Sequence, residues 1–255
     1  MPLSALGWDV EPGVVIGCLI LIALYGHFTV WRSRWRGALF VAGTAIMLLA
    51  LISPLDTLAD QYLFSAHMVQ HLLLLEVTAP LLVLGVTTEL AEEWLAVPWV
   101  ARWERRLRNP MAAWAIGFGT LLAWHAPRLY DWAVASDAVH AVEHISFVIS
   151  AAIFWWPVLA PRASSRMPAH EAVIYLFARL SANIVLGTVL AAAPLGTYAA
   201  YAHAPLTQLG WGITAALDQR LGGYLMWAPS LLLDFAAIPL ILAIWGSRSM
   251  AEETV

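Results

Sequence analysis

The chain has 255 residues, of which 61% are hydrophobic and only 12% are charged, and its formal net charge is −4. Its mean hydropathy of +0.74 is far too high for a water-soluble domain of this length. The sequence also contains no basic patch and no Gly-rich phosphate loop, so the composition excludes a soluble globular protein and a nucleic-acid-binding protein.

Seven apolar runs approach the roughly 20 residues that a membrane-spanning helix needs. They cover residues 14–31, 38–53, 62–86, 111–126, 138–160, 171–193 and 222–246. The second and fourth runs are short, and a count of six follows if one run is re-entrant. The sequence therefore predicts an all-α integral membrane bundle, with residues 1–255 as a single transmembrane domain.

The segments outside these runs have distinct characters. The N-terminal stretch carries Asp9 and Glu11 instead of a basic signal-peptide region, so the first run is expected to be a retained anchor. Residues 87–109 are amphipathic with mixed charge and are expected to lie along the cytoplasmic surface as a short helix. Residues 194–221 are expected to form an outer loop.

Arginine alone sets the predicted orientation, because the chain contains no lysine. Ten arginines fall in the loops of one side: Arg32, Arg34, Arg36, Arg102, Arg105, Arg106, Arg108, Arg162, Arg166 and Arg248. The loops of the other side hold only Arg128 and Arg220. Positive charge stays on the cytoplasmic side, which predicts an outer N-terminus and a cytoplasmic C-terminus.

Five of the eight histidines fall at one predicted depth near the outer surface. They are His67, His71, His125, His140 and His144. Four of them form the strings "HMVQH" and "HAVEH", and residues four apart on a helix share a face with Cβ atoms about 5–6 Å apart. Ionisable groups inside a bilayer are costly and tend to mark function. This layer predicts an outward-facing metal site.

Imidazole ligands suit zinc, copper, iron and nickel, and added thioether sulfur shifts the preference towards copper(I). Further residues predicted for the same layer, as ligands or auxiliary groups, are Met68, Glu143, Asp218, Gln219 and Met226. Met68 is rotated about 100° from the preceding histidine and is able to face elsewhere. Cys18 is the only cysteine, so the chain has no thiolate cluster.

The competing interpretation is that a histidine in a span is a hydrogen-bonded packing residue, and it is the preferred one for His27, His170 and His203. A second polar set, Glu76, Arg179 and Asp234, falls near mid-bilayer. Charges at that depth normally pair inside the bundle, so Arg179 is expected to contact one or both acids. The alternative is a proton or ion path.

Four strings in order carry a family resemblance: "SAHMVQHLLLLEVTAPLLVLG", "WHAPRLYDWA", "HAVEHISFVISAAIFWWPV" and "DQRLGGYLMW". Together they resemble the multi-spanning CtaG-type cytochrome c oxidase assembly factors of bacteria, over about residues 14–246. The matching positions are His67, His71, His125, His140, His144, Asp218, Gln219 and Met226.

The resemblance implies a multi-pass protein of the bacterial plasma membrane that helps to mature a haem-copper oxidase by handling or delivering copper. Its implied partners are an oxidase subunit and, as a further candidate, a periplasmic copper chaperone. No catalytic residue is predicted.

Two alternatives from other classes stay open. An intramembrane zinc hydrolase needs three protein ligands and an open position; His67, His71 and His144 could supply the ligands, with Ser65 nearby. A b-type haem protein would use histidines from facing helices as axial ligands.

Overall fold

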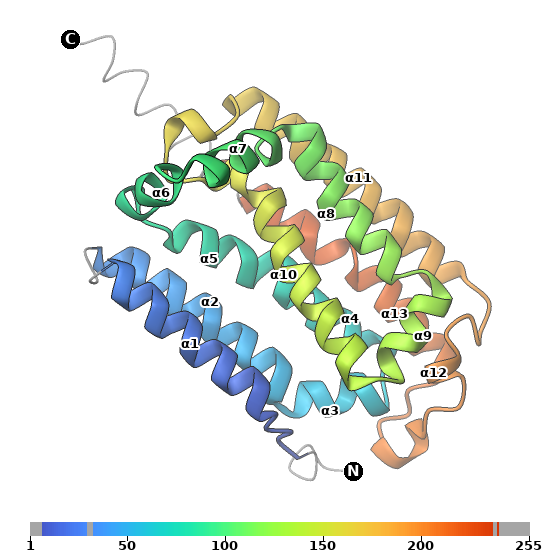
Figure 1. Ribbon diagram of the computed structural model, residues 1–255. Coiled ribbons are helices and arrows are strands. Elements are labelled where there is room, and N and C mark those ends of the chain that lie inside the picture. The colour runs from blue at the N-terminus through green and yellow to red at the C-terminus, as the bar shows by residue number, and fades with distance from the viewer. Residues whose placement is uncertain (1–6, 30–32, 237–238, 240–255) are drawn as a thin grey trace.

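The computed structural model describes residues 7–29, 33–236 and 239, and within these residues the regular structure is helical, with no strand. Helices α1 (Pro12–Thr29) and α2 (Arg34–Ile52) pack side by side (Figure 1). The next span, Phe64–Gly85, is continuous but changes its winding. It consists of α4 (Phe64–Leu72), the π-helical turn η2 (Leu73–Thr78) and α5 (Ala79–Gly85).

The second half of the bundle contains four further helices. They are α8 (Pro110–Trp124), α10 (Asp137–Leu159), α11 (Ala169–Ala192) and α13 (Ala215–Leu225). Helical residues 228–236 follow α13. The span α4–α5 is central: α5 packs against α2 and α10, and α4 packs against α13.

Short helices cover the two ends of the bundle (Figure 1). One end carries α3 (Pro54–Gln61), α9 (Pro127–Val134), α12 (Ala199–Ala202) and the 3-10 turn η4 (Leu206–Leu209). The other end carries α6 (Thr88–Leu95), α7 (Pro98–Leu107) and the 3-10 turn η3 (Ala163–Ser165). The amphipathic segment 87–109 therefore forms two helices, because Pro98 starts a new one. The expected loop 194–221 contains α12, η4 and the start of α13.

Five helices in the described part of the chain are long and apolar enough to cross a membrane: Pro12–Thr29, Arg34–Ile52, Phe64–Gly85, Asp137–Leu159 and Ala169–Ala192. The fourth predicted run corresponds to α8, which has only 15 residues. The seventh run, 222–246, begins inside α13, and its end lies outside the described residues. The all-helical membrane architecture is confirmed, whereas the seven-span count and the orientation of the termini stay predictions.

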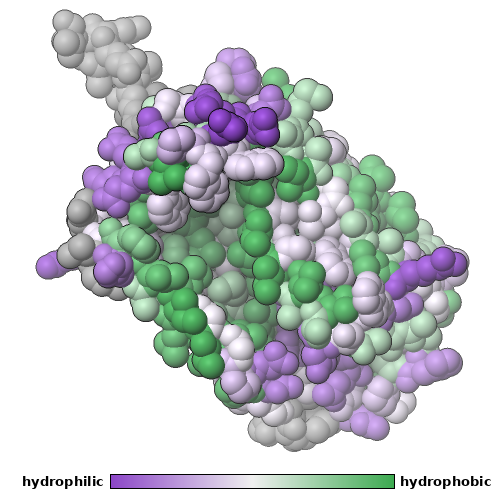
Figure 2. Space-filling model, in the orientation of Figure 1, coloured by the Kyte–Doolittle hydropathy of each residue, from purple (hydrophilic) through white to green (hydrophobic). Residues whose placement is uncertain are grey.

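The surface is that of a protein surrounded by lipid. Figure 2 shows hydrophobic residues along the middle of the visible face and hydrophilic residues gathered towards its two ends. On α1, Ile16, Leu19 and Ile20 are each more than half exposed, at 54%, 62% and 52%. Such a large exposed apolar surface is stable only against hydrocarbon or another protein.

Small residues let α11 and α13 approach closely. A Cβ atom built on Gly187 would lie 2.3 Å from the carbonyl oxygen of Gly223, and one on Gly223 would lie 2.5 Å from the backbone nitrogen of Ala191. Neither contact tolerates a side chain, so glycine is required at this crossing, as at many close helix crossings in membranes.

A buried ion triad joins three elements near the middle of the bundle. Arg179 of α11 pairs with both Glu76 of η2 and Asp234 of the last helical segment. Its guanidinium carbon also lies 5.1 Å from the ring centroid of Trp155 and 5.6 Å from that of Phe154. Removing one member of such a group leaves an uncompensated charge in a low-dielectric interior.

The π-helical turn that carries Glu76 was not expected from the sequence. Such turns interrupt the regular backbone pattern, and Trp155 donates from Nε1 to the carbonyl oxygen of Leu75 at 3.1 Å. The wider turn changes the rotational phase between the histidine half and the Glu76 half of this span.

We expect Gly187→Leu to lower the free energy of unfolding by about 2 kcal/mol, because overpacking forces α11 and α13 apart. Thermal unfolding of the detergent-solubilised protein, followed by tryptophan fluorescence, measures the change. Gly119→Leu is the matched control, since a Cβ atom at Gly119 meets nothing within 4 Å. If the two variants had equal melting temperatures, the close crossing of α11 and α13 at Gly187 would be contradicted.

We expect Arg179→Met to destabilise the protein by about 3–5 kcal/mol, because two buried carboxylates lose their partner. Arg102→Met, at an exposed position on α7, is the control. The same thermal measurement decides, and a loss no larger than that of the control would show that the triad contributes nothing.

Candidate metal centre

Four buried histidines and the half-buried His140 come from three elements. His67 and His71 stand on α4, His125 directly follows α8, and His140 and His144 stand on α10. The remaining three, His27, His170 and His203, are exposed. The five histidines predicted to share one depth are thus the less exposed ones, and the three others are exposed.

The five imidazoles converge on one place. The ring centroid of His67 lies 4.3 Å from that of His71 and 5.1 Å from that of His140. His140 and His144 are 4.1 Å apart, and His71 and His125 are 5.5 Å apart. The two histidine pairs and the single histidine thus form one cluster at the α3 end of the bundle.

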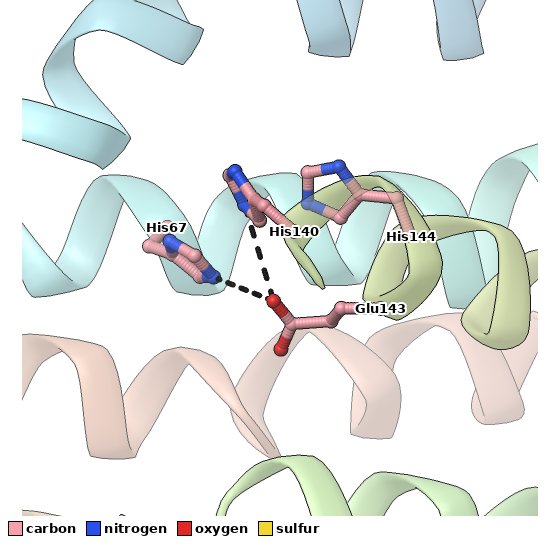
Figure 3. Close-up of side chains that lie close together, drawn as sticks. All are labelled: His67, His140, Glu143 and His144. Atoms are coloured by element: carbon pink, nitrogen blue, oxygen red, sulfur yellow. Dashed lines mark ion pairs between the residues drawn. The ribbon is translucent and has the colours of Figure 1, made fainter. Parts of the chain in front are cut away.

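Glu143 is completely buried, and Figure 3 shows its carboxylate facing His67 and His140. Its Oε2 atom lies 3.8 Å from Nε2 of His67 and 3.9 Å from Nε2 of His140. Its Oε1 atom lies 3.5 Å from Nε2 of His71. One ligand atom from each of four residues falls within 4.8 Å of all the others: His67, His140, Glu143 and His144.

Eight side-chain atoms of these residues are buried and have no hydrogen-bond partner. They are Nε2 of His67, His71, His125, His140 and His144, Nδ1 of His71, and both carboxylate oxygens of Glu143. A buried polar atom without a partner costs about 1–3 kcal/mol, so this concentration of them needs a compensating group. Imidazole nitrogens and a carboxylate are the ligands that zinc and copper take, and the residues fit such a cation.

Tyr201 of α12 fixes the tautomer of His67. Its hydroxyl donates to the carbonyl oxygen of Ala59, which uses its only proton. The contact of 3.2 Å between the hydroxyl oxygen and Nδ1 of His67 therefore requires the imidazole to donate. Nε2 of His67 is left with a free lone pair directed at Glu143, which is the form that binds metal.

The backbone and a carboxylate orient two further rings. Nδ1 of His125 lies 2.8 Å from the carbonyl oxygen of Leu121, and donation there leaves Nε2 as the acceptor. Nδ1 of His140 faces Oδ1 of Asp60 at 3.6 Å. Burial raises the pKa of Asp60 to about 7, and the neighbouring carboxylates of Asp56 and Asp137 shift the pKa in the same direction.

Asp218 and Gln219 do not join the cluster but hold the helices around it. Leu63, at the N-cap of α4, has no side-chain acceptor, and Asp218 of α13 replaces it by accepting from the backbone N–H of Phe64 at 2.8 Å and of Ser65 at 3.0 Å. The Gln219 amide donates to the carbonyl oxygens of Leu190 and Ala193, at the end of α11.

Met68 and Met226 are fully buried in a hydrophobic cluster with Phe64 and Phe147, where α4 meets α13. Cys18 lies buried in α1 as a free thiol. The group whose ligand atoms come together thus consists of imidazoles and one carboxylate.

Sequence reasoning missed two residues next to the cluster. Asp60 and Tyr201 come from α3 and from the expected outer loop, and no local spacing links either of them to a histidine. Glu143 was named as an auxiliary group, yet its place at the centre follows from its position three residues after His140 on the same helical face.

Comparison with known proteins identifies one family. A family model described as cytochrome c oxidase caa3 assembly factor (Caa3_CtaG) matches residues 19–248, which is most of the chain. Neither the curated proteins nor the solved structures contain a match. The match includes all five clustered histidines and the ion triad, and the chain belongs to the Caa3_CtaG family of cytochrome c oxidase caa3 assembly factors.

Proposed function

We propose that this protein handles or delivers copper during the assembly of a haem-copper cytochrome c oxidase, and that the histidine–glutamate cluster holds the ion. The observation that carries the proposal is the set of buried, unpartnered nitrogen and oxygen atoms in the cluster, where four residues each bring one ligand atom within 4.8 Å of the others. Family membership supplies the oxidase assembly role. The residues that would hold the cargo are His67, His140, Glu143 and His144, with His71 and His125 beside them.

Copper is favoured over other divalent ions because it forms the most stable complexes with nitrogen and oxygen ligands in the first-row series. Zinc is the alternative. The imidazole rings pack against one another at centroid distances of 4.1 to 5.5 Å, which favours a single ion over a planar haem between them. Ser65 donates its hydroxyl to Asp218 and is engaged in capping, which weakens the hydrolase alternative.

The arginine distribution supports an outer N-terminus in a bacterial plasma membrane. In that orientation the α3 end, and the cluster with it, faces outward. A cargo site there would meet an oxidase subunit within the bilayer, and a periplasmic copper chaperone is a further candidate partner. Binding and transfer need no catalytic residue.

We expect the protein purified in detergent to contain copper near one equivalent, and the His67→Ala/His144→Ala variant to lose it. Two of the four converging ligands are then absent, and His140 and Glu143 alone remain of the group whose ligand atoms lie close enough to share one ion. Elemental analysis measures the metal. The exposed pair His27→Ala/His203→Ala is the control and should retain it.

Two results would count against the proposal. Zinc in place of copper would move the zinc hydrolase ahead. A metal-free protein whose His67→Ala/His144→Ala variant still supports full oxidase activity would refute metal handling at this cluster.

We expect Tyr201→Phe to weaken copper binding by about 10–100-fold, because His67 loses the partner that fixes its tautomer. Competition with a chelator of known affinity measures the change. Tyr224→Phe, at an exposed tyrosine of α13, is the control. Unchanged affinity at equal folded content would show that Tyr201 serves packing alone.

A further inference from the structure

A cavity of about 420 Å³ reaches the histidine cluster from one side. It lies between α1, α2, α3 and α10, and His140 and His144 form part of its wall. The two faces of the cluster differ in exposure: the side chain of His140 is 12% exposed, whereas those of His67 and Glu143 are fully buried. The cavity therefore meets the cluster at its most accessible ligand.

The cavity is acidic. Four carboxylates line it, from Glu11, Asp56, Asp60 and Asp137, and no arginine is among the described residues of its wall. A concave, low-dielectric surface lined by one sign of charge raises the local concentration of the opposite ion. A cation approaching this end of the bundle would be drawn into the cavity.

Two features show that the acidic group leads to a ligand site. His144 is 7% exposed, and its Nε2 atom lacks a partner although the residue lines the cavity. Asp60 lines the same cavity and faces Nδ1 of His140 at 3.6 Å. The acidic wall thus leads from α3 into the cluster through the carboxylate of Asp60 and then the imidazoles of His140 and His144.

We propose that this cavity is the port through which a metal cation enters and leaves the histidine cluster, with the carboxylates as its attracting lining. The inference rests on the proposed function, since a port needs a site behind it. Glycines of α1 keep it open: a Cβ atom on Gly13 or Gly17 meets nothing within 4 Å, and both residues line the cavity. A large side chain at either position would fill the port without displacing the backbone.

The test separates the rate of loading from final occupancy. Metal-free full-length protein in detergent is mixed rapidly with Co²⁺, an optical probe of imidazole ligation, and the visible absorbance gives both quantities. We expect Gly17→Phe to slow loading several-fold at unchanged final absorbance. Gly119→Phe, at an open glycine of α8 outside the cavity, should load at the wild-type rate.

The charge of the lining is tested in the same way. Glu11→Gln/Asp137→Asn should slow loading by about tenfold at low ionic strength, and added salt should remove the difference. The control Glu92→Gln/Glu171→Gln removes two exposed carboxylates elsewhere and should leave the rate unchanged.

The outcomes distinguish this inference from the function behind it. Wild-type protein that gives no Co²⁺ spectrum and retains no copper would overturn the proposed function and the port together. Gly17→Phe protein that loads fully at the wild-type rate would overturn the port alone. If the Gly17→Phe protein reaches a lower final absorbance, Gly13→Phe, one turn earlier on α1, is measured in its place. Slow loading to the full absorbance then supports the port, and full loading at the wild-type rate overturns it.

Discussion

Lone pairs that face one another inside an apolar bundle are the constraint on which the α3 end of this protein depends. Because Nδ1 of His67 and of His125 is engaged, Nε2 of each neutral imidazole is an acceptor, and both carboxylate oxygens of Glu143 lack partners. Acceptors cannot satisfy one another, and a low dielectric makes each unsatisfied one more costly. A cation bound between them would satisfy several at once. The elements around the cluster are consistent with holding it for that purpose: α13 caps α4 through Asp218, and α12 presents Tyr201.

The central span carries a second polar centre of a different kind. Arg179 lies between Glu76 and Asp234, so each carboxylate has an opposite charge beside it. Oε2 of Glu76 and Oδ2 of Asp234 lack hydrogen-bond partners, but each carboxylate is paired through its other oxygen, and the group joins three elements, as expected of one that fixes helix packing. The histidine cluster contains no positive residue, and its groups are left to an outside partner. This difference in internal compensation separates a structural site from a binding site more firmly than depth in the membrane does.

The parts of this design that follow helical periodicity could be predicted from the sequence. The two histidine pairs needed only a spacing of four and a common depth, and Glu143 needed only its place on the same face as His140. The contributions of Asp60 and Tyr201 could not be predicted, because they depend on how α3 and α12 fold over the end of the bundle. The π-helical turn was also hidden, and it changes which face of the span Glu76 presents relative to the histidines.

A cargo site has to retain its ion and still release it, and under the proposed function these two requirements would fall on different sides of the cluster. Towards α1 the wall carries four carboxylates and two glycines among apolar side chains, including those of Val14, Met47 and Leu51. Elsewhere the cluster is closed by aromatic packing, with Tyr130 of α9 and Phe147 of α10 completely buried against the histidines. Ligand number would then set the affinity, while the α1 side would set the rates of entry and exit. A partner that contacted α1 and α10 could accelerate release without altering a single ligand, which is how a tightly held ion can be handed on only where its recipient is bound.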